Sequence, residues 1–129
     1  MKANRYYSVS FDERNYPEIM RLRMMCGGIV AYGRWEALKQ ILYDAEGQID
    51  IKESLTRQLL LHELDFDSDE DLTNFIQACI RLGLLIQEFP NDRQVLISSN
   101  EVSAGIAYKR KQAKSGKKGG QMKAANKDK

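Results

Sequence analysis

The chain has few of the residues on which catalysis and metal binding usually depend. Its 129 residues include one histidine, His62, and two cysteines, Cys26 and Cys79. A single histidine leaves no more than one base for a Ser-His or Cys-His pair and rules out a multi-histidine metal site. The cysteines lack the paired spacing of a zinc or redox motif, so we interpret them as small buried hydrophobic residues. We therefore expect neither an enzyme nor a metal site.

Long apolar segments are also missing. No run approaches the roughly 18 apolar residues of a membrane-spanning helix, and residues 1–7 lack the apolar stretch of a signal peptide. We therefore expect a cytoplasmic protein without membrane contact. Residues 115–120, Ser-Gly-Lys-Lys-Gly-Gly, lack the Gly-x4-Gly-Lys-Ser/Thr spacing and the preceding strand of a phosphate-binding loop. No cofactor or other small-molecule ligand is expected.

What the chain does have is charge divided into three blocks. Residues 1–40 carry a net charge of +3, residues 41–104 of −9 and residues 105–129 of +8, so the overall +2 conceals a basic tail on an acidic body. Clustered Lys and Arg displace counterions from phosphates whatever the base sequence, so the tail indicates nucleic-acid or acidic-partner binding. Beyond about Ser115 it has too few apolar residues to offset the entropy of ordering, and we expect disorder there.

Apolar periodicity predicts a mainly helical domain. The clearest helix is that of residues 67–82, which Ser68 can cap and Gly83 can end. Residues 52–64 form a second amphipathic pattern, and its leucines are expected to face inward: Leu55, Leu59, Leu60 and Leu64. Further helices are expected over residues 17–25, over residues 30–43 and from residue 98 into the tail. Two residue pairs have the spacing of a capping pair: Asp50 with Glu53, and Ser98 with Glu101.

Short strands are expected between these helices, over residues 6–10, 48–51, 84–88 and 94–98. The last two flank Pro90-Asn91-Asp92, so they predict a hairpin. Helix, short strand, helix, helix and hairpin is the order of a winged helix. We therefore predict a winged-helix domain over residues 1–108, which includes an N-terminal strand and helix, and a largely disordered basic tail over residues 109–129.

Three stretches give the chain a family resemblance. They are Ala-Tyr-Gly-Arg-Trp-Glu-Ala-Leu at 31–38, Phe-Ile-Gln-Ala-Cys-Ile-Arg-Leu-Gly-Leu-Leu at 75–85, and Lys-Ser-Gly-Lys-Lys-Gly-Gly at 114–120. With them, the chain resembles the N-terminal domain of bacteriophage and prophage replication-initiation proteins, also known as replisome organisers or DnaD-like proteins. The resemblance implies a winged helix, a role in phage DNA replication inside a bacterial host, and a helicase, primase or loader as protein partner.

In a winged helix the default function is duplex recognition by the second helix of the helix-turn-helix, here residues 67–82. Its candidate base-reading residues are Asn74, Gln77 and Arg81, because Asn and Gln suit adenine edges and Arg suits guanine. The N-terminal end of this helix is acidic, however. One like-charge pair about 4 Å apart costs about 4 kcal/mol at an effective dielectric of about 20, against about 1–3 kcal/mol for a good base contact. An ordinary solvated face is therefore the favoured interpretation.

The tail is the stronger candidate for nucleic-acid contact, and Tyr108 could stack on an unpaired base beside it. Its candidate phosphate-binding residues are Lys109, Arg110, Lys111, Lys114, Lys117, Lys118 and Lys123. Two alternatives stay open: a solubilising tail, and a tail that docks on the acidic middle block of its own or a neighbouring molecule. A second positive patch could come from the first helices, through Arg14, Arg21, Arg23, Arg34 and Lys39.

These observations leave three hypotheses for function. The first is sequence-tolerant DNA binding through the tail, with the body as an assembly or partner module that could form a homo-oligomer. The second is a protein–protein adaptor whose acidic middle binds a replication partner without DNA contact. The third is sequence-specific operator binding through residues 67–82. The aromatic residues in the apolar pattern are expected in the core rather than at a stacking surface: Tyr32, Trp35, Phe66 and Phe75.

Overall fold

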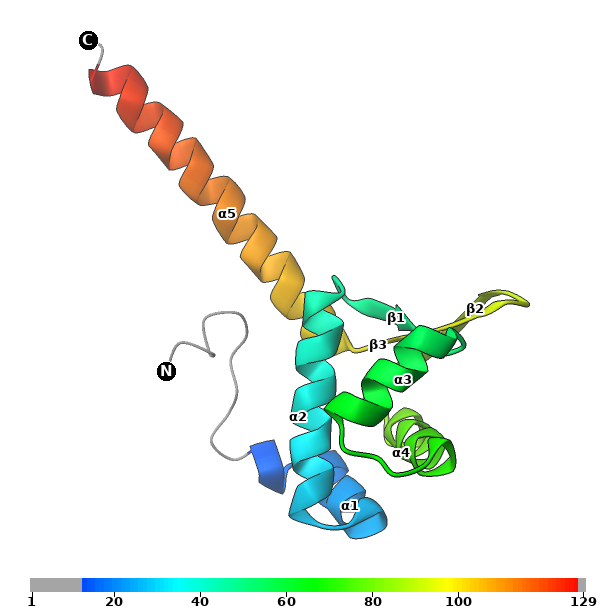
Figure 1. Cartoon of the computed structure of the whole chain (residues 1–129). Helices are drawn as coiled ribbons and strands as arrows, with labels where there is room; N and C mark the ends of the chain where they lie inside the picture. The colour runs from blue at the N-terminus through cyan, green and yellow to red at the C-terminus, as the bar shows by residue number, and fades with distance from the viewer. Residues whose placement is uncertain (1–12, 128–129) are drawn as a thin grey trace.

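The computed structural model describes the backbone of residues 13–127 and the side chains of residues 13–113. This part of the chain is mainly helical and carries one small antiparallel sheet (Figure 1). The strand expected over residues 6–10 lies outside the described residues. The elements are η2 (Glu13–Asn15), α1 (Pro17–Cys26), α2 (Ile29–Asp44), β1 (Gln48–Asp50), α3 (Ser54–Glu63), α4 (Asp69–Arg81), β2 (Ile86–Asn91), β3 (Gln94–Ser98) and α5 (Asn100–Lys127).

Helices α1 and α2 pack against each other, and the turn between them lies at the bottom of the molecule in Figure 1. Pro17 begins α1, where its missing N–H costs nothing. Gly27 ends α1 at a φ of 103°, which a residue with a Cβ rarely adopts, and its amide bonds the Arg23 carbonyl. The chain can therefore turn within two residues into α2, which packs against α1, α5 and β1, whereas α4 packs against α1 and α3.

Helix α4 follows its predicted pattern. The Ser68 Oγ accepts a hydrogen bond of 3.1 Å from the amide of Asp71, which confirms the expected N-cap. The face toward the core is buried along its length: Leu72, Phe75, Ile76, Ala78 and Cys79. Phe75 meets Phe66 with ring centroids 5.5 Å apart, so the loop between α3 and α4 also packs on the core.

The three strands form a sheet in the order β1-β3-β2, with both pairs antiparallel. Ser98 on the central strand lies opposite both Gln48 and Ile86. The expected hairpin is confirmed, but β2 runs through Pro90 and Asn91, with an irregular register after Glu88, and the turn lies at residues 92–93. The sheet covers one end of the helical body.

One hydrophobic core joins the helices to the sheet. Trp35 and Phe75 are 1–2 % exposed, whereas Tyr32 and Phe66 are half-buried beside them, which agrees with the predicted core role of the aromatics. Cys79 is fully buried and Cys26 half-buried, and both are free. Burial raises the pKa of both thiols, and the shift is larger for Cys79. Within the described residues, no helix is both long and apolar enough to span a membrane.

Two expectations for α3 are wrong. Leu60 and Leu64 are buried, but Leu55 and Leu59 are 71 % and 47 % exposed, because α3 packs by a narrow stripe at one side of the body. The Asp50–Glu53 capping pair does not form. The Asp50 carboxylate instead accepts hydrogen bonds from the amides of Lys52 and Val95, so it joins β1 to β3 rather than capping a helix.

Helix α5 also differs from its prediction at both ends. Ser99, not Ser98, caps it, since the Ser99 Oγ accepts from the amide of Val102 at 3.4 Å. The expected disordered tail is not confirmed, because α5 continues as helix to Lys127. Lys, Gln and Ala favour helix enough to carry the segment past its glycines. The domain boundary expected at residue 108 therefore falls inside one helix.

Candidate nucleic-acid interface

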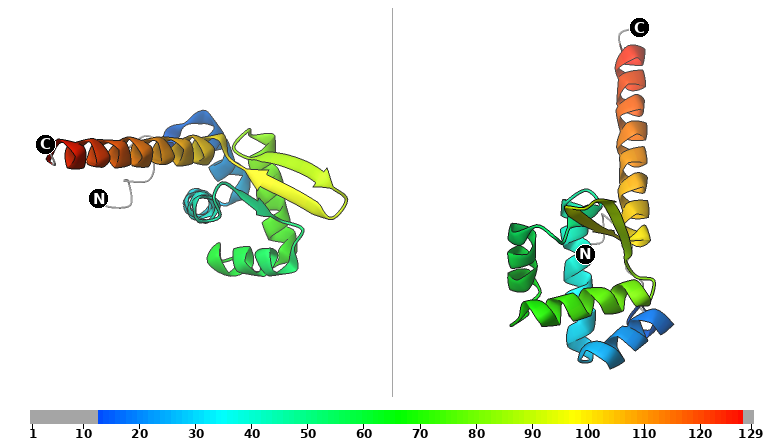
Figure 2. Two further views of the ribbon diagram at one scale, coloured as in Figure 1. Left: turned by 90° about the horizontal axis from the view of Figure 1, so that it is seen from above. Right: turned by 90° about the vertical axis from the view of Figure 1, so that its right-hand side faces the viewer.

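Helix α5 projects from the body as a straight arm, and the views in Figures 1 and 2 agree on this. Just beyond the body it exposes the side chains of Tyr108, Lys109, Arg110 and Lys111. Between residues 109 and 127 the sequence contains eight Lys or Arg and no Asp or Glu. The candidates Lys114, Lys117, Lys118 and Lys123 lie on the same helix, and their side chains are outside the described ones. A basic helix of 19 residues is about 28 Å long, which matches several phosphate spacings.

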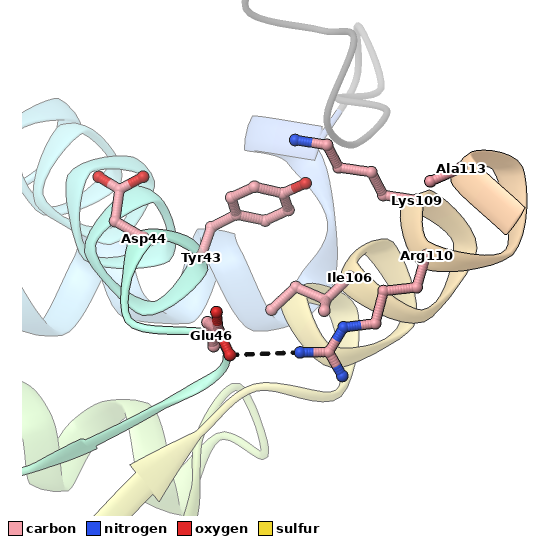
Figure 3. Close-up of a pocket in the computed structure, with 7 residues that line it drawn as sticks. All are labelled: Tyr43, Asp44, Glu46, Ile106, Lys109, Arg110 and Ala113. Carbon is pink, nitrogen blue, oxygen red and sulfur yellow. Dashed lines mark hydrogen bonds and ion pairs between the residues drawn. The ribbon is translucent and has the colours of Figure 1, made fainter. Parts of the chain in front are cut away.

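The root of this arm is fixed where α5 meets the end of α2 (Figure 3). The Arg110 guanidinium lies 3.3 Å from a Glu46 carboxylate oxygen, and the Lys109 ammonium lies 5.4 Å from the centroid of the Tyr43 ring. Ile106 lies against Gly47, whose φ of 107° allows the turn into β1. Tyr43, Glu46, Ile106, Lys109 and Arg110 border a pocket of about 400 Å³. Two of the candidate cations are therefore partly engaged with the body.

A buried lysine ties the first turn of α5 to the rest of the fold. Lys39 of α2 is fully buried and donates to Glu13 Oε1 at 2.5 Å and to Glu101 of α5 at 3.2 Å. Its Nζ also lies 2.8 Å from a Glu36 carboxylate oxygen. Three carboxylates around one ammonium supply the partners that a buried charge requires. Lys39 thus joins η2, α2 and α5, and we call this group the Lys39 cluster.

The cluster sets the protonation of its members. Burial disfavours the charged form of Lys39, but the hydrogen bonds to Glu13 and Glu36 outweigh it and raise the pKa of Lys39 above its usual value. Burial, more than the neighbouring Glu13, raises the pKa of Glu36. Tyr32 donates to Glu13 at 3.2 Å, and its burial, together with the charges of Glu36 and Glu13, raises its pKa to about 12. At neutral pH Lys39 is charged and Tyr32 is neutral.

Helices α3 and α4 are held together by Arg57. Its guanidinium donates to the Asp69 carboxylate at 2.6 Å, to the Ile51 carbonyl at 3.0 Å and to the Thr73 hydroxyl. Asp69 is one of the acidic residues at the start of α4, so Arg57 offsets part of the negative charge there. Glu70 and Asp71 stay exposed beside it.

The predicted base-reading stripe of α4 is solvent-exposed. Asn74, Gln77 and Arg81 are all exposed and follow one another at helical spacing, whereas Thr73 is half-buried under Arg57. The turn of the hairpin presents Arg93 next to Asp92, whose carbonyl is bonded by Lys52. The face that could approach a duplex therefore mixes isolated cations with a more acidic helix start.

Three of the five residues expected in a second positive patch on the first helices are engaged within the fold, whereas Arg14 and Arg21 are exposed. Lys39 is buried in its cluster, so it offers no surface charge. Arg34 donates to the carbonyls of Leu64 and Asp65, both at 2.7 Å, and lies over the Phe66 ring, so it closes the end of α3. Arg23 donates to the Arg14 carbonyl at 3.3 Å. These cations hold the fold together rather than forming one basic surface.

A groove of about 540 Å³ runs between α2 and α3. Its floor is apolar and made of small or branched residues, including Ala37, Ile41 and Leu59. Its polar rim includes Asp44 and Glu63, and no Lys or Arg lines it. We call this feature the α2–α3 groove. Leu59 faces this groove rather than the core, which explains its exposure.

Sequence reasoning did not find the Lys39 cluster, the Arg57 contacts or the α2–α3 groove. The cluster joins residues 26 and 62 positions apart, and charged residues are usually at the surface, so the sequence gives no signal for it. The groove had one available signal, a leucine pattern on residues 52–64 wider than one core-facing stripe needs.

The described residues hold no group of three or more His, Cys, Asp or Glu arranged to bind a metal ion. His62 is exposed on α3. Comparisons of the chain with protein-family models, with curated proteins and with solved structures find no match. What the protein does must therefore be argued from its own residues.

Proposed function

We propose that the protein is a non-enzymatic, nucleic-acid-binding protein of bacteriophage or prophage DNA replication, acting in the cytoplasm of the bacterial host. It binds DNA through the basic part of α5, residues 109–127, with little dependence on base sequence. The replication setting comes from the family resemblance of residues 31–38, 75–85 and 114–120. One observation supports the binding: residues 109–127 of α5, with eight cations and no carboxylates, project from an otherwise acidic body.

We further propose that the body is a winged helix. The order of α2, β1, α3, α4 and the β2–β3 hairpin, together with the strand order β1-β3-β2, supports this assignment. In that fold α4 would be the recognition helix and the β2–β3 hairpin the wing. The acidic start of α4 argues against phosphate contact there, so the body serves as an assembly or partner module.

Fluorescence anisotropy of labelled single-stranded and duplex DNA tests the binding. The full chain is compared with a variant in which Lys114, Lys117, Lys118 and Lys123 are replaced by Gln. The slope of log K against log salt should become shallower by up to about 3 on single strands and about 4 on duplex, because each phosphate contact contributes about 0.7 or 0.9. A matched control, Lys52→Gln with Arg93→Gln, removes cations of the hairpin region and should leave the slope unchanged.

The same experiment separates the other two functions. Asn74→Ala with Gln77→Ala should leave affinity unchanged on every duplex tested; loss of a strong preference for one duplex would instead support operator binding. The adaptor function is favoured by the acidic rim of the α2–α3 groove. It predicts no DNA binding at low salt and a stable complex with a helicase, primase or loader. An unchanged slope in the four-lysine variant would overturn the role of α5.

A further inference from the structure

The α2–α3 groove has the chemistry of a binding site for a basic segment. Its apolar floor includes Ala37, Ile41 and Leu59, and Leu59 is 47 % exposed although it is a large hydrophobic residue. Asp44 and Glu63 add two carboxylates to its lining, which includes no Lys or Arg. Asp44 also borders the neighbouring pocket at the start of the arm, which Lys109 and Arg110 line, whereas Glu63 does not. An apolar groove with an acidic rim between two helices fits an extended or helical segment rich in Lys and Arg.

The chain itself contains such a segment. Residues 109–127 carry eight Lys or Arg and no carboxylate. They continue α5 as helix. The charge blocks of the sequence are therefore complementary: the groove belongs to the block of net −9, and the segment belongs to the block of +8.

The segment does not lie in the groove of its own molecule. The root of α5 is held against the end of α2 by the Arg110–Glu46 and Lys109–Tyr43 contacts, and Glu101 is fixed by Lys39. From this root the helix runs away from the body (Figures 1 and 2). The residues that line the groove belong mainly to α2 and α3. A straight helix anchored in this way reaches another molecule before it reaches its own α3.

We propose that residues 114–127 of one copy, beyond the anchored root, bind in the α2–α3 groove of a second copy. The two surfaces differ, so each copy keeps one free segment and one free groove, and the contact can repeat into open head-to-tail chains. It does not depend on DNA. DNA and the groove compete for the same lysines, so binding to nucleic acid releases copies from the chain.

Sedimentation velocity of the full chain, without DNA, tests the proposal at about 50 mM and about 500 mM salt, since the higher salt screens the contact. The wild type should sediment as growing oligomers with rising concentration at low salt and as monomer at high salt. Leu59→Lys with Glu63→Lys, which places two cations in the groove, should be monomeric at both. Glu88→Lys with Phe89→Lys is the matched control, since it makes the same charge change at exposed positions of β2 and should assemble like the wild type.

A mixing experiment makes the test specific. The variant with Lys114, Lys117, Lys118 and Lys123 replaced by Gln keeps a groove but no basic segment, and the Leu59→Lys/Glu63→Lys variant keeps a segment but no groove. Each alone should be monomeric, and an equimolar mixture should form a 1:1 dimer of about twice the monomer mass.

Three outcomes overturn the proposal: a wild type that is monomeric at low salt, including one that only becomes more compact; assembly that survives the groove substitutions; and a mixture that stays monomeric. DNA binding is read separately by anisotropy, and the groove variant should retain it, so failure of one proposal is distinguishable from failure of the other.

Discussion

The protein has positive charges in two opposite environments, one buried and one exposed. Lys39 is fully buried and surrounded by Glu13, Glu36 and Glu101. Arg110, near the root of the arm, has a side chain 68 % exposed and pairs with Glu46, which is itself exposed. A buried charge that loses its partners must be desolvated without compensation, whereas an exposed charge exchanges a partner for water. The first therefore serves stability, and the second is available to bind phosphates.

Replacing Lys39 should have the largest effect on stability. Lys39→Met leaves the buried Glu13 carboxylate and its neighbours without a counter-charge, so the free energy of unfolding should fall by about 3–5 kcal/mol. Urea unfolding followed by the fluorescence of Trp35 measures it. Lys111→Met, at an exposed position of α5, is the control and should change stability by less than about 0.5 kcal/mol. A loss below about 1 kcal/mol for Lys39→Met would show that the cluster is not a structural centre.

Arg57 lies between the two extremes, because its side chain is 21 % exposed and has several partners. Arg57→Ala removes hydrogen bonds to Asp69, Thr73 and the Ile51 carbonyl, and we expect a loss of about 1.5–3 kcal/mol, as for hydrogen bonds to a charged group. The same urea titration measures it, with Arg93→Ala in the exposed hairpin turn as control. Equal effects of the two substitutions would contradict the proposed connection between α3 and α4.

Alkaline pH should weaken the fold through the same cluster. The pKa of Tyr32 is about 12 in the folded protein against an ordinary value of 10, so the unfolded chain loses this proton first and stability falls between those values. The pKa of Lys39 is also raised, so its contribution is complete below the unfolded-state value and is lost as pH rises through the folded one. Urea midpoints measured up this pH range should decline, and Tyr32→Phe should decline less steeply. A flat profile would contradict the protonation states given above.

The smallest effect is expected at the exposed ion pair. Arg110→Gln should change the free energy of unfolding by less than about 0.5 kcal/mol, because exposed pairs gain little beyond their hydration. Thermal unfolding of the two proteins measures this difference. If Arg110→Gln instead cost more than 1 kcal/mol, the root of α5 would be a rigid structural joint and the contrast with Lys39 would disappear.

Local signals in the sequence were enough to predict the helices and the hairpin. Ser68 and the apolar residues of α4 act within a few positions of one another, so capping and periodicity report directly on that helix. Gly27 and Gly83 likewise mark helix ends at positive φ. The same signals could not decide whether Leu55 and Leu59 face the core, because that depends on how far α3 stands from α2.

Long-range polar contacts escaped prediction for a physical reason. Glu101 has the spacing of a capping residue after Ser98, but its carboxylate accepts a hydrogen bond from Lys39. Lys39 is 62 positions away, so no residue near Glu101 in the sequence predicts this contact. Asp50 likewise accepts a hydrogen bond from the Val95 amide instead of forming the expected capping pair with Glu53. At the candidate interface, the sequence correctly predicted exposed side chains on α4, at Asn74, Gln77 and Arg81, and at residues 108–111 of α5. Its anchoring by Tyr43 and Glu46 required the three-dimensional fold.

The Lys39 cluster also bears on how the ends of this fold come apart. One ammonium holds Glu13 near the beginning of the described chain and Glu101 near the start of the last helix, across separations of 26 and 62 residues. It therefore closes a long loop much as a crosslink does, and in the unfolded chain closing such a loop is entropically costly. Fraying of η2 and fraying of the first turn of α5 become one event rather than two. Hydrogen exchange in these two segments should accordingly share a single opening free energy.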